Sequence, residues 1–396
     1  SSSSALQHDD YIFSAITTDE GGSVAKSKRI ASIDWMRGFV MILMLLDHVS
    51  MAYNAQHDSS DSAALYVSGT PLPAFEFLTR WISHLCAPVF VFLAGTALAI
   101  SIERKLARGF DSRKIDRDIL LRGAFIAILD PTIISLFSGR MTIQVLYAIG
   151  VAMMCMALLR RFSSTSLILM AVAWIGLGEL LTTQFWPPEA DNIESILAAL
   201  TFSTYATADM VIKYPLLPWL AMMVLGWVFG RYLLSYNDGE ARIGPVSLLL
   251  ITGLLSLGLF VFIRYFNDYG NMFLYREDNS WQHWLHVSKY PPSATFILLE
   301  LGVMSMIMAL MMIIERIVGV RPNGVLLVFG QTAMIFYLVH RLILEGTATH
   351  LGLRHFSDLT TTYIITIVML ILLYPFCLWY RGFKAKHPDS PWLRYL

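Results

Sequence analysis

The stretch SIDWMRGFVMILMLLDHVS, residues 32–50, decides the fold class of this chain. It is apolar and close to the roughly 20 residues that a bilayer-spanning helix needs. It nevertheless contains Asp34, Arg37, Asp47 and His48. An ionisable side chain at the centre of a span costs about 2.5–3.5 kcal/mol even on the lowest scales, so each is a candidate functional residue.

Helical periodicity sorts these four side chains onto two flanks. Asp34, Arg37 and His48 lie on one face, since their spacing follows the 3.6-residue period, and Asp47 points to another flank, where we expect a partner on a second helix. His48 lies about 16 Å from Arg37 along the axis at 1.5 Å per residue. An ion pair between Asp34 and Arg37 and a hydrogen bond from His48 to a neighbouring helix are the structural alternatives.

Composition extends this reading to the whole chain. The 396 residues are 56% hydrophobic and only 15% charged, whereas soluble domains have roughly 25% charged residues. Long apolar runs recur, and strands of a membrane β-barrel would instead alternate in polarity. We therefore predict an all-α polytopic membrane protein with about ten spans, near residues 33–54, 81–101, 117–137, 141–159, 165–183, 213–234, 245–266, 293–315, 324–343 and 360–380.

Basic residues predict the orientation of these spans. Lys and Arg gather before the first span, between the second and third, and after the last, which by the positive-inside rule places both termini in the cytoplasm. We expect three segments: a flexible cytoplasmic extension over 1–28, a membrane domain over 29–383 and a cytoplasmic tail over 384–396. The expected location is a bacterial inner membrane, and the zero net charge gives no indication of nucleic-acid binding.

Further polar residues are predicted near the outer ends of other spans. Arg80 and His84 fall on the second span, and Tyr337 and His340 fall on the ninth, at a depth similar to that of His48. Three histidines at one depth predict a polar cavity that opens outward. They lack the carboxylate or cysteine that would complete a metal site, so we predict no metal.

The long outward connection over 267–292 contains Lys289 and two tryptophans. It is either an aromatic anchor at the membrane interface or a lid over an outward-facing site. Small residues on the second span, AGTALA over 94–99, allow close helix approach and are compatible with a homodimer.

Six ordered segments resemble the bacterial branch of the heparan-α-glucosaminide N-acetyltransferase catalytic-domain family, a group of transmembrane acyltransferases. They are RIASIDWMRGFVMILMLLDHVSMAY, TRWISHLCAPVFVFLAGTALAIS, QVLYAIGVAMM, IKYPLLPWLAMMVLGWVFG, SKYPPSATFILLELG and VFGQTAMIFYLVH, between residue 29 and about residue 380. The resemblance implies transfer of an acyl group, usually acetyl, from cytoplasmic acetyl-CoA to an amine or hydroxyl of a sugar outside.

The resemblance also implies roles for the polar residues. Cations on the cytoplasmic side would hold the CoA thioester, with Arg37 beside Asp34 and with Arg122 inside an apolar segment. A histidine would take the proton of the attacking group or be acylated itself, and His48 is the first candidate.

The family also supplies competitors for the catalytic role. The animal lysosomal branch has Asn where His48 stands and a functional histidine slightly later, so His57 is the second candidate and His84 the third. Asp47 is included in the catalytic set. The acceptor would be bound by Arg80, Lys289, His340 and Tyr337.

Two other classes of protein remain open. A transporter or permease for a small polar solute would use the same charges for gating, but the chain shows none of the internal repeats typical of many transporters. A non-catalytic partner or sensor would keep the fold without the chemistry. Binding of acetyl-CoA separates the enzyme from both.

Overall fold

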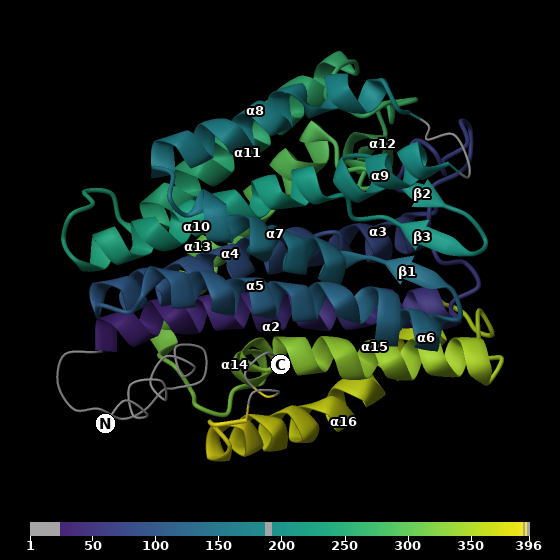
Figure 1. Cartoon of the computed structure of the whole chain (residues 1–396). Helices are drawn as coiled ribbons and strands as arrows, with labels where there is room; N and C mark the ends of the chain where they lie inside the picture. The colour runs from purple at the N-terminus through teal and green to yellow at the C-terminus, as the bar shows by residue number, and fades with distance from the viewer. Residues whose placement is uncertain (1–23, 187–191, 391–392, 394–396) are drawn as a thin grey trace. The chain divides into compact units, whose positions relative to one another are not determined.

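The computed structural model describes residues 24–186, 192–390 and 393, with side chains from residue 31 onward (Figure 1). Residues 1–23 of the predicted N-terminal extension lie outside this range. The described chain divides into two compact units. Unit 1 contains residues up to Ala55, Leu233–Ile251 and Met304 onward, and unit 2 contains Gln56–Tyr232 and Thr252–Val303.

Within the described residues, eight helices are long and apolar enough to cross a membrane, or up to nine if one bent pair counts as a span. The protein is therefore a multi-pass integral membrane protein, but the predicted count of ten is too high. The two differences lie at the fourth and ninth predicted spans. The orientation of the termini stays a prediction, as do the boundaries of the three expected segments.

Unit 1 is built on helix α2 (Val24–Tyr53), which packs against α14 (Val325–Gln331), α15 (Ala333–His350) and α16 (Leu359–Lys386). Glycines bring α2 and α14 together backbone to backbone. A Cβ built on Gly38 would lie 2.0 Å from the carbonyl oxygen of Leu326, and one on Gly330 would lie 1.9 Å from that of Asp34. Only glycine fits this crossing, because both neighbours are main-chain atoms.

The ninth predicted span, 324–343, is two helices rather than one. α14 and α15 meet at Thr332 with a bend of 86°, and α15 then continues to His350. No proline explains this break. The main-chain contact of Gly330 with α2 lies two residues before the break.

Unit 2 contains most of the remaining helices. They are α3 (Ala74–Ser83), α4 (Cys86–Ala107), α5 (Ser112–Leu129), the π-helix η2 (Asp130–Ile134), α6 (Ser135–Ser138), α7 (Val145–Leu159), α8 (Ser164–Thr183), α9 (Ile193–Thr201) and α12 (Trp281–Leu285). Three further helices cross between the sequence ranges of the two units: α10 (Leu216–Asn237), α11 (Pro245–Phe266) and α13 (Ala294–Val318).

The fourth predicted span, 141–159, is shorter than expected. Residues Met141–Ile143 form strand β1, which pairs in parallel with β3 (Met210–Ile212), and β3 pairs antiparallel with β2 (Tyr205–Ala206). Helix α7 begins only at Val145, where the Asp130 carboxylate accepts the backbone N–H groups of Gln144 and Tyr147. Its 15 residues reach about 22 Å, less than the roughly 30 Å of a bilayer core.

The second predicted span, 81–101, begins earlier and is interrupted. α3 ends at Ser83 and α4 begins at Cys86, so His84 caps α3 at a junction between helices. The prolines at 215 and 218 lie before α10 and in its first turn, where a proline is compatible with a helix.

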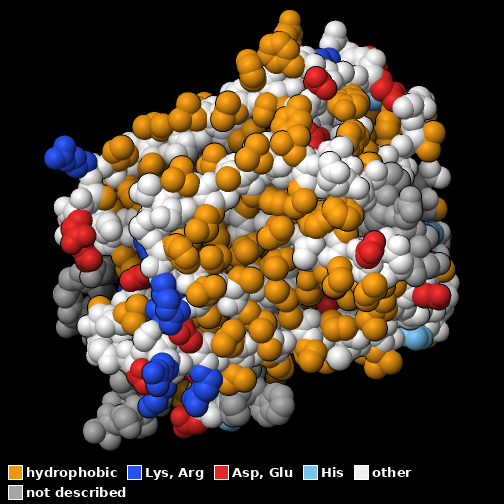
Figure 2. Space-filling view, turned by 45° about the horizontal axis from the view of Figure 1, so that its top comes forward, with side chains coloured by type: hydrophobic (Ala, Val, Ile, Leu, Met, Phe, Trp, Pro, Cys, Tyr) orange, Lys and Arg blue, Asp and Glu red, His pale blue; other side chains and the backbone are white. Residues whose placement is uncertain are grey.

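The outer surface fits a lipid environment. Large apolar side chains are exposed on α8 and on the unit 2 part of α11, among them Leu177, Leu180, Leu254, Leu255 and Phe262. Figure 2 shows a face that is largely hydrophobic, with charged side chains mainly toward its margins.

Candidate active site

Asp34 and Arg37 form an ion pair on α2 in unit 1. Arg37 Nη1 lies 3.5 Å from Asp34 Oδ1, and both residues are buried. The Gly330 contact fixes the backbone of Asp34, and Ser32, two residues earlier on α2, donates a hydrogen bond to the Glu315 carboxylate. The i,i+3 spacing therefore predicted this ion pair correctly. An ion pair of this kind also forms where its role is only structural.

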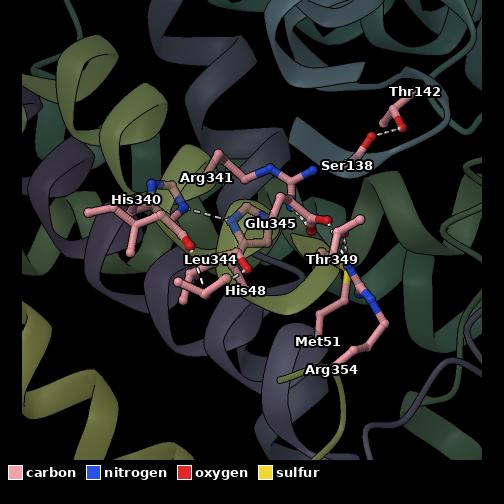
Figure 3. Close-up of polar contacts among 12 residues, drawn as sticks. His48, Met51, Ser138, Thr142, His340, Arg341, Leu344, Glu345, Thr349 and Arg354 are labelled. Carbon is pink, nitrogen blue, oxygen red and sulfur yellow. Dashed lines mark hydrogen bonds and ion pairs between the residues drawn. The ribbon is translucent and has the colours of Figure 1, made fainter. Parts of the chain in front are cut away.

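His48 lies further along α2 and meets His340 of α15. His48 Nδ1 and His340 Nε2 are 2.7 Å apart, and the rings stack with centroids 5.0 Å apart and planes 14° apart (Figure 3). Tyr337 presents its ring edge-on to both imidazoles, at 6.3 Å from His48 and 5.5 Å from His340. The structure therefore brings together three of the residues selected from the sequence.

The hydrogen bonds define the tautomers of this pair. His340 Nδ1 lies 2.8 Å from the carbonyl oxygen of Phe336, which only accepts, so Nδ1 carries the proton. His340 is fully buried, which favours the neutral ring with a lone pair at Nε2. His48 Nδ1–H is then the donor, and Nε2 of His48 carries the lone pair that accepts a proton.

An ion-pair network lies on the same helix, beyond His340. The Glu345 carboxylate accepts from Arg341 Nη1 at 3.2 Å and from Arg354 Nη2 at 2.9 Å (Figure 3). Because Arg354 follows the end of α15, the network ties the segment after α15 to the helix. Ser357 in that segment also hydrogen-bonds the carbonyl oxygen of Tyr53, at the end of α2.

Unit 2 contains a second polar cluster, centred on Asp61. Asp61 Oδ2 accepts from Arg80 Nε at 2.9 Å, from Arg80 Nη2 at 2.6 Å and from His84 Nε2 at 2.9 Å. Burial alone would raise the pKa of the Asp61 carboxyl, but Arg80, the His84 hydrogen bond and Lys289 together hold that pKa well below its usual range. The carboxylate is therefore ionised and acts only as an acceptor.

Lys289 and Tyr290 complete this cluster. Arg80 Nη2 donates to the Tyr290 hydroxyl at 3.3 Å. Lys289 Nζ lies over the rings of Tyr214 and Tyr290, at 5.6 and 5.1 Å from their centroids, and its side chain is buried. Burial would raise the pKa of the Tyr290 phenol, but Lys289, Arg80 and Lys213 lower it.

The remaining candidates, Asp47, His57 and Arg122, differ in their burial. Asp47 is buried on α2, His57 is half-buried in the segment after α2, and Arg122 is exposed on α5. Arg122 lies within the candidate span Ser112–Ser138, as expected, and its role in holding the donor stays a prediction. Among the described residues, no three His, Cys, Asp or Glu side chains are placed to hold a metal ion.

Sequence reasoning missed Asp61, Tyr290 and Glu300. Asp61 lies in the polar segment QHDSSDS, where an acidic residue is ordinarily solvated. Its burial at 3% exposure depends on partners 19 to 23 residues away, Arg80 and His84. The nearby DSSD pattern contains no signal that separates buried Asp61 from half-buried Asp58.

Comparison with known proteins gives one family match. A family model described as heparan-alpha-glucosaminide N-acetyltransferase, catalytic, matches residues 29–265, more than half of the chain. The match includes His48, Asp61, Arg80 and His84, and it confirms the resemblance over these residues. His340 and Lys289 lie beyond it. No curated protein matches the chain significantly.

Proposed function

Because the chain belongs to the heparan-alpha-glucosaminide N-acetyltransferase catalytic family, we propose that it transfers an acetyl group from cytoplasmic acetyl-CoA to an extracytoplasmic sugar. The family implies a membrane-bound N-acetyltransferase with acetyl-CoA as donor, and the apolar helices agree with a membrane enzyme. The proposal adds the sidedness, an amine or hydroxyl as the acceptor group, and a bacterial inner membrane as the location.

The observation that carries this proposal is the oriented imidazole of His48. A base must be positioned and in the correct tautomer to take a proton, and such a group typically contributes about 10²–10⁴-fold to rate. Phe336 fixes His340, and His340 fixes His48 with its lone pair at Nε2. A histidine with a structural role alone does not require this two-step orientation.

Arg37 supports the donor end of the proposal. It lies on the same helix as His48, about 16 Å away along the axis at 1.5 Å per residue, which suits an extended pantetheine arm between a held nucleotide and a reacting thioester. Asp34 would orient the guanidinium toward the CoA phosphates through the ion pair at 3.5 Å. Arg37 and Asp34 are thus proposed as donor-binding residues.

The chemical step needs one base and one leaving group. The acceptor nitrogen or oxygen attacks the thioester carbonyl carbon, its proton passes to His48 Nε2, and the carbon–sulfur bond breaks. The same proton then returns to the thiolate, which gives the acetylated acceptor and CoA. Alternatively, Nε2 itself attacks the carbonyl carbon and the carbon–sulfur bond breaks, which leaves an acyl-imidazole and the CoA thiolate. The acceptor then attacks the acyl carbon, the bond to Nε2 breaks, and the acceptor proton passes through the released imidazole to the thiolate.

Tyr337 and His340 are proposed to bind the acceptor in unit 1, and the binding roles of Arg80 and Lys289, in unit 2, stay a prediction from the sequence. Tyr337 and His340 contact the His48 ring or each other, and Arg80 and Lys289 belong to the Asp61 cluster. His84 and His57 remain the alternative bases, with Asp47 an auxiliary group. A homodimer stays compatible with the small-residue helix faces.

Purified protein in detergent, incubated with labelled acetyl-CoA and glucosamine, tests the function. We expect acetyl-CoA binding and N-acetylglucosamine formation. His48→Gln should lower kcat by about 10²–10⁴-fold, and His340→Gln should lower kcat while leaving the KM for acetyl-CoA near wild type. His350→Gln, an exposed change on the same helix as His340, is the matched control.

Three outcomes would contradict parts of the proposal. Absence of acetyl-CoA binding at millimolar concentration would reject the enzyme and favour a transporter or sensor. Full activity of His48→Gln would move the base to His57 or His84. A labelled acyl-protein that forms without acceptor, and is lost in His48→Gln, would replace direct transfer by the covalent route.

A further inference from the structure

The Asp61 carboxylate in unit 2 fixes the tautomer of His84. Asp61 is ionised and offers only lone pairs, so the 2.9 Å contact requires that His84 Nε2 carries the proton. Arg80 donates twice to the same carboxylate oxygen and holds it in place. A neutral His84 therefore has its lone pair at Nδ1.

His84 Nδ1 is a buried acceptor whose hydrogen bond is not made within the described protein. Its atom is shielded from solvent and no donor among the described residues reaches it. An unsatisfied buried acceptor costs about 1–3 kcal/mol, so such an atom is retained where a ligand or a water supplies the donor.

The His84 ring lies beside aromatic side chains, and two other buried polar atoms belong to the same region. The ring packs edge-on against Phe296, which also meets Trp219. Trp219 Nε1 and Glu300 Oε1 are likewise buried without a hydrogen-bond partner in the described residues. The charged and titratable groups that face this region are Asp61 from the segment before α3, Arg80 from α3, Lys289 and Tyr290 from the segment before α13, and Glu300 from α13.

The unmatched acceptor His84 Nδ1 and the unmatched donor Trp219 Nε1 suit a ligand that both donates and accepts hydrogen bonds. A hydroxyl or an amine does so, whereas a purely anionic ligand would leave His84 Nδ1 unsatisfied. The aromatic rings beside these atoms provide apolar contact for the carbon skeleton of such a ligand.

We propose that Asp61 is a positioning residue that presents His84 Nδ1 as the proton acceptor for the hydroxyl or amine of a ligand bound in unit 2. The proposal rests on the proposed function only in identifying this ligand as the acyl acceptor, and in that case His84, the alternative base named above, takes the proton in place of His48. Asp61 does not touch the ligand, and it acts by fixing the His84 ring, as a carboxylate does for a catalytic histidine in other enzymes.

Nitrogen NMR of the full-length protein, labelled with ¹⁵N-histidine, tests the tautomer without any assay of activity. The His84 signals are assigned by their loss in His84→Gln. We expect an unprotonated Nδ1 and a protonated Nε2 in the wild type, and a shift of the Nδ1 signal when glucosamine is added. Asp61→Asn should move the proton to Nδ1, because the asparagine amide can donate to Nε2.

Kinetics separate positioning from a structural role. Asp61→Asn should lower kcat by about 10²–10⁴-fold with the KM for acetyl-CoA unchanged. Asp61→Glu should restore part of the rate, because it keeps the carboxylate. Asp58→Asn, three residues earlier in the same segment, should behave as the wild type in both measurements.

Failure of this proposal and failure of the proposed function give different experimental results. A wild-type His84 with its proton on Nδ1, or an Nδ1 signal that glucosamine leaves unmoved, overturns the proposal whatever the enzyme activity. An Nδ1 that shifts with glucosamine in a protein that transfers no acetyl group supports the site and rejects the acyltransferase. If Asp61→Asn does not fold, the wild-type spectra alone decide.

Discussion

Replacing Gly330 by alanine tests the packing that holds the proposed donor-binding pair. The new Cβ would lie 1.9 Å from the Asp34 carbonyl oxygen, 2.6 Å from its carbon and 3.0 Å from its Cα. All three are main-chain atoms, so no side-chain rotation relieves the clash. Because real Cβ atoms essentially never approach closer than 3.0 Å, α2 and α14 must separate by at least about 1 Å.

Two opposing effects determine how Gly330→Ala changes the free energy of unfolding. Overpacking costs about 1–3 kcal/mol, and a rigid main-chain clash belongs at the upper end of that range. Removal of a helical glycine returns about 0.5–1 kcal/mol. The net loss of about 2 kcal/mol lowers Tm by roughly 4–8 °C at 2–4 °C per kcal/mol. Since a 1 Å displacement can cost about 10²-fold in rate, acetyl transfer should fall by a similar factor.

Tryptophan-fluorescence melting in detergent measures the first effect. Gly382→Ala on α16 is the matched control, because nothing lies within 4 Å of the Cβ that it adds. It should leave Tm unchanged or raise it slightly. Equal melting temperatures for Gly330→Ala and Gly382→Ala would refute the argument that α2 and α14 meet at main-chain contact.

Three further changes probe other parts of the chain. Arg264 donates to Asn271 and to three main-chain carbonyls of the connection after α11, so Arg264→Lys should leave buried acceptors unmatched and make segment 267–292 sensitive to limited proteolysis. The ionised Asp61 stabilises the fold above its ordinary pKa of 3.8, and this contribution is lost as the pH falls through its lower folded-state value. The stability of Asp61→Asn should therefore change less than that of the wild type between about pH 4 and pH 2. Arg37→Gln should weaken acetyl-CoA binding by about 10–100-fold, as loss of a charged hydrogen bond worth 1.5–3 kcal/mol predicts.

The first of these three has a matched control, and each has a contrary result. Arg242→Lys, an exposed change, should leave proteolysis at the wild-type rate, and equal cleavage in Arg264→Lys would show that the segment is held by other contacts. An acid-stability curve of Asp61→Asn that parallels the wild type would mean that Asp61 is not held ionised. Unchanged acetyl-CoA affinity in Arg37→Gln would restrict Arg37 to its ion pair with Asp34.

Local sequence patterns were sufficient for the face of α2. The 3.6-residue period alone places Asp34, Arg37 and His48 in line, and the ion pair at 3.5 Å follows from the i,i+3 spacing. Expected depth also placed His340 near His48, which the 2.7 Å hydrogen bond confirms across 292 residues of sequence. These predictions depend on regular helices, whose geometry is independent of the rest of the fold.

The features that sequence reasoning missed depend on tertiary contacts. The break at Thr332 has no proline and arises beside the Gly330 contact with α2. The late start of α7 depends on the Asp130 carboxylate, which lies fourteen residues before Gln144 in the chain. The burial of Asp61 depends on Arg80 and His84. In each case a distant group overrides the local pattern.

The hydrogen bond from His340 to the Phe336 carbonyl also restricts where protons go. A proton that arrives at His48 can be shared with His340 Nε2 through the hydrogen bond between the two rings. The next group along these hydrogen bonds is the Phe336 carbonyl oxygen, which has no proton of its own to pass on. The His48–His340 pair can therefore accept a proton but cannot pass it further along this route. Acetyl transfer through His48 would then move no net charge along this route. The proton of the acceptor would return to the CoA sulfur, and no proton would cross the bilayer by this path.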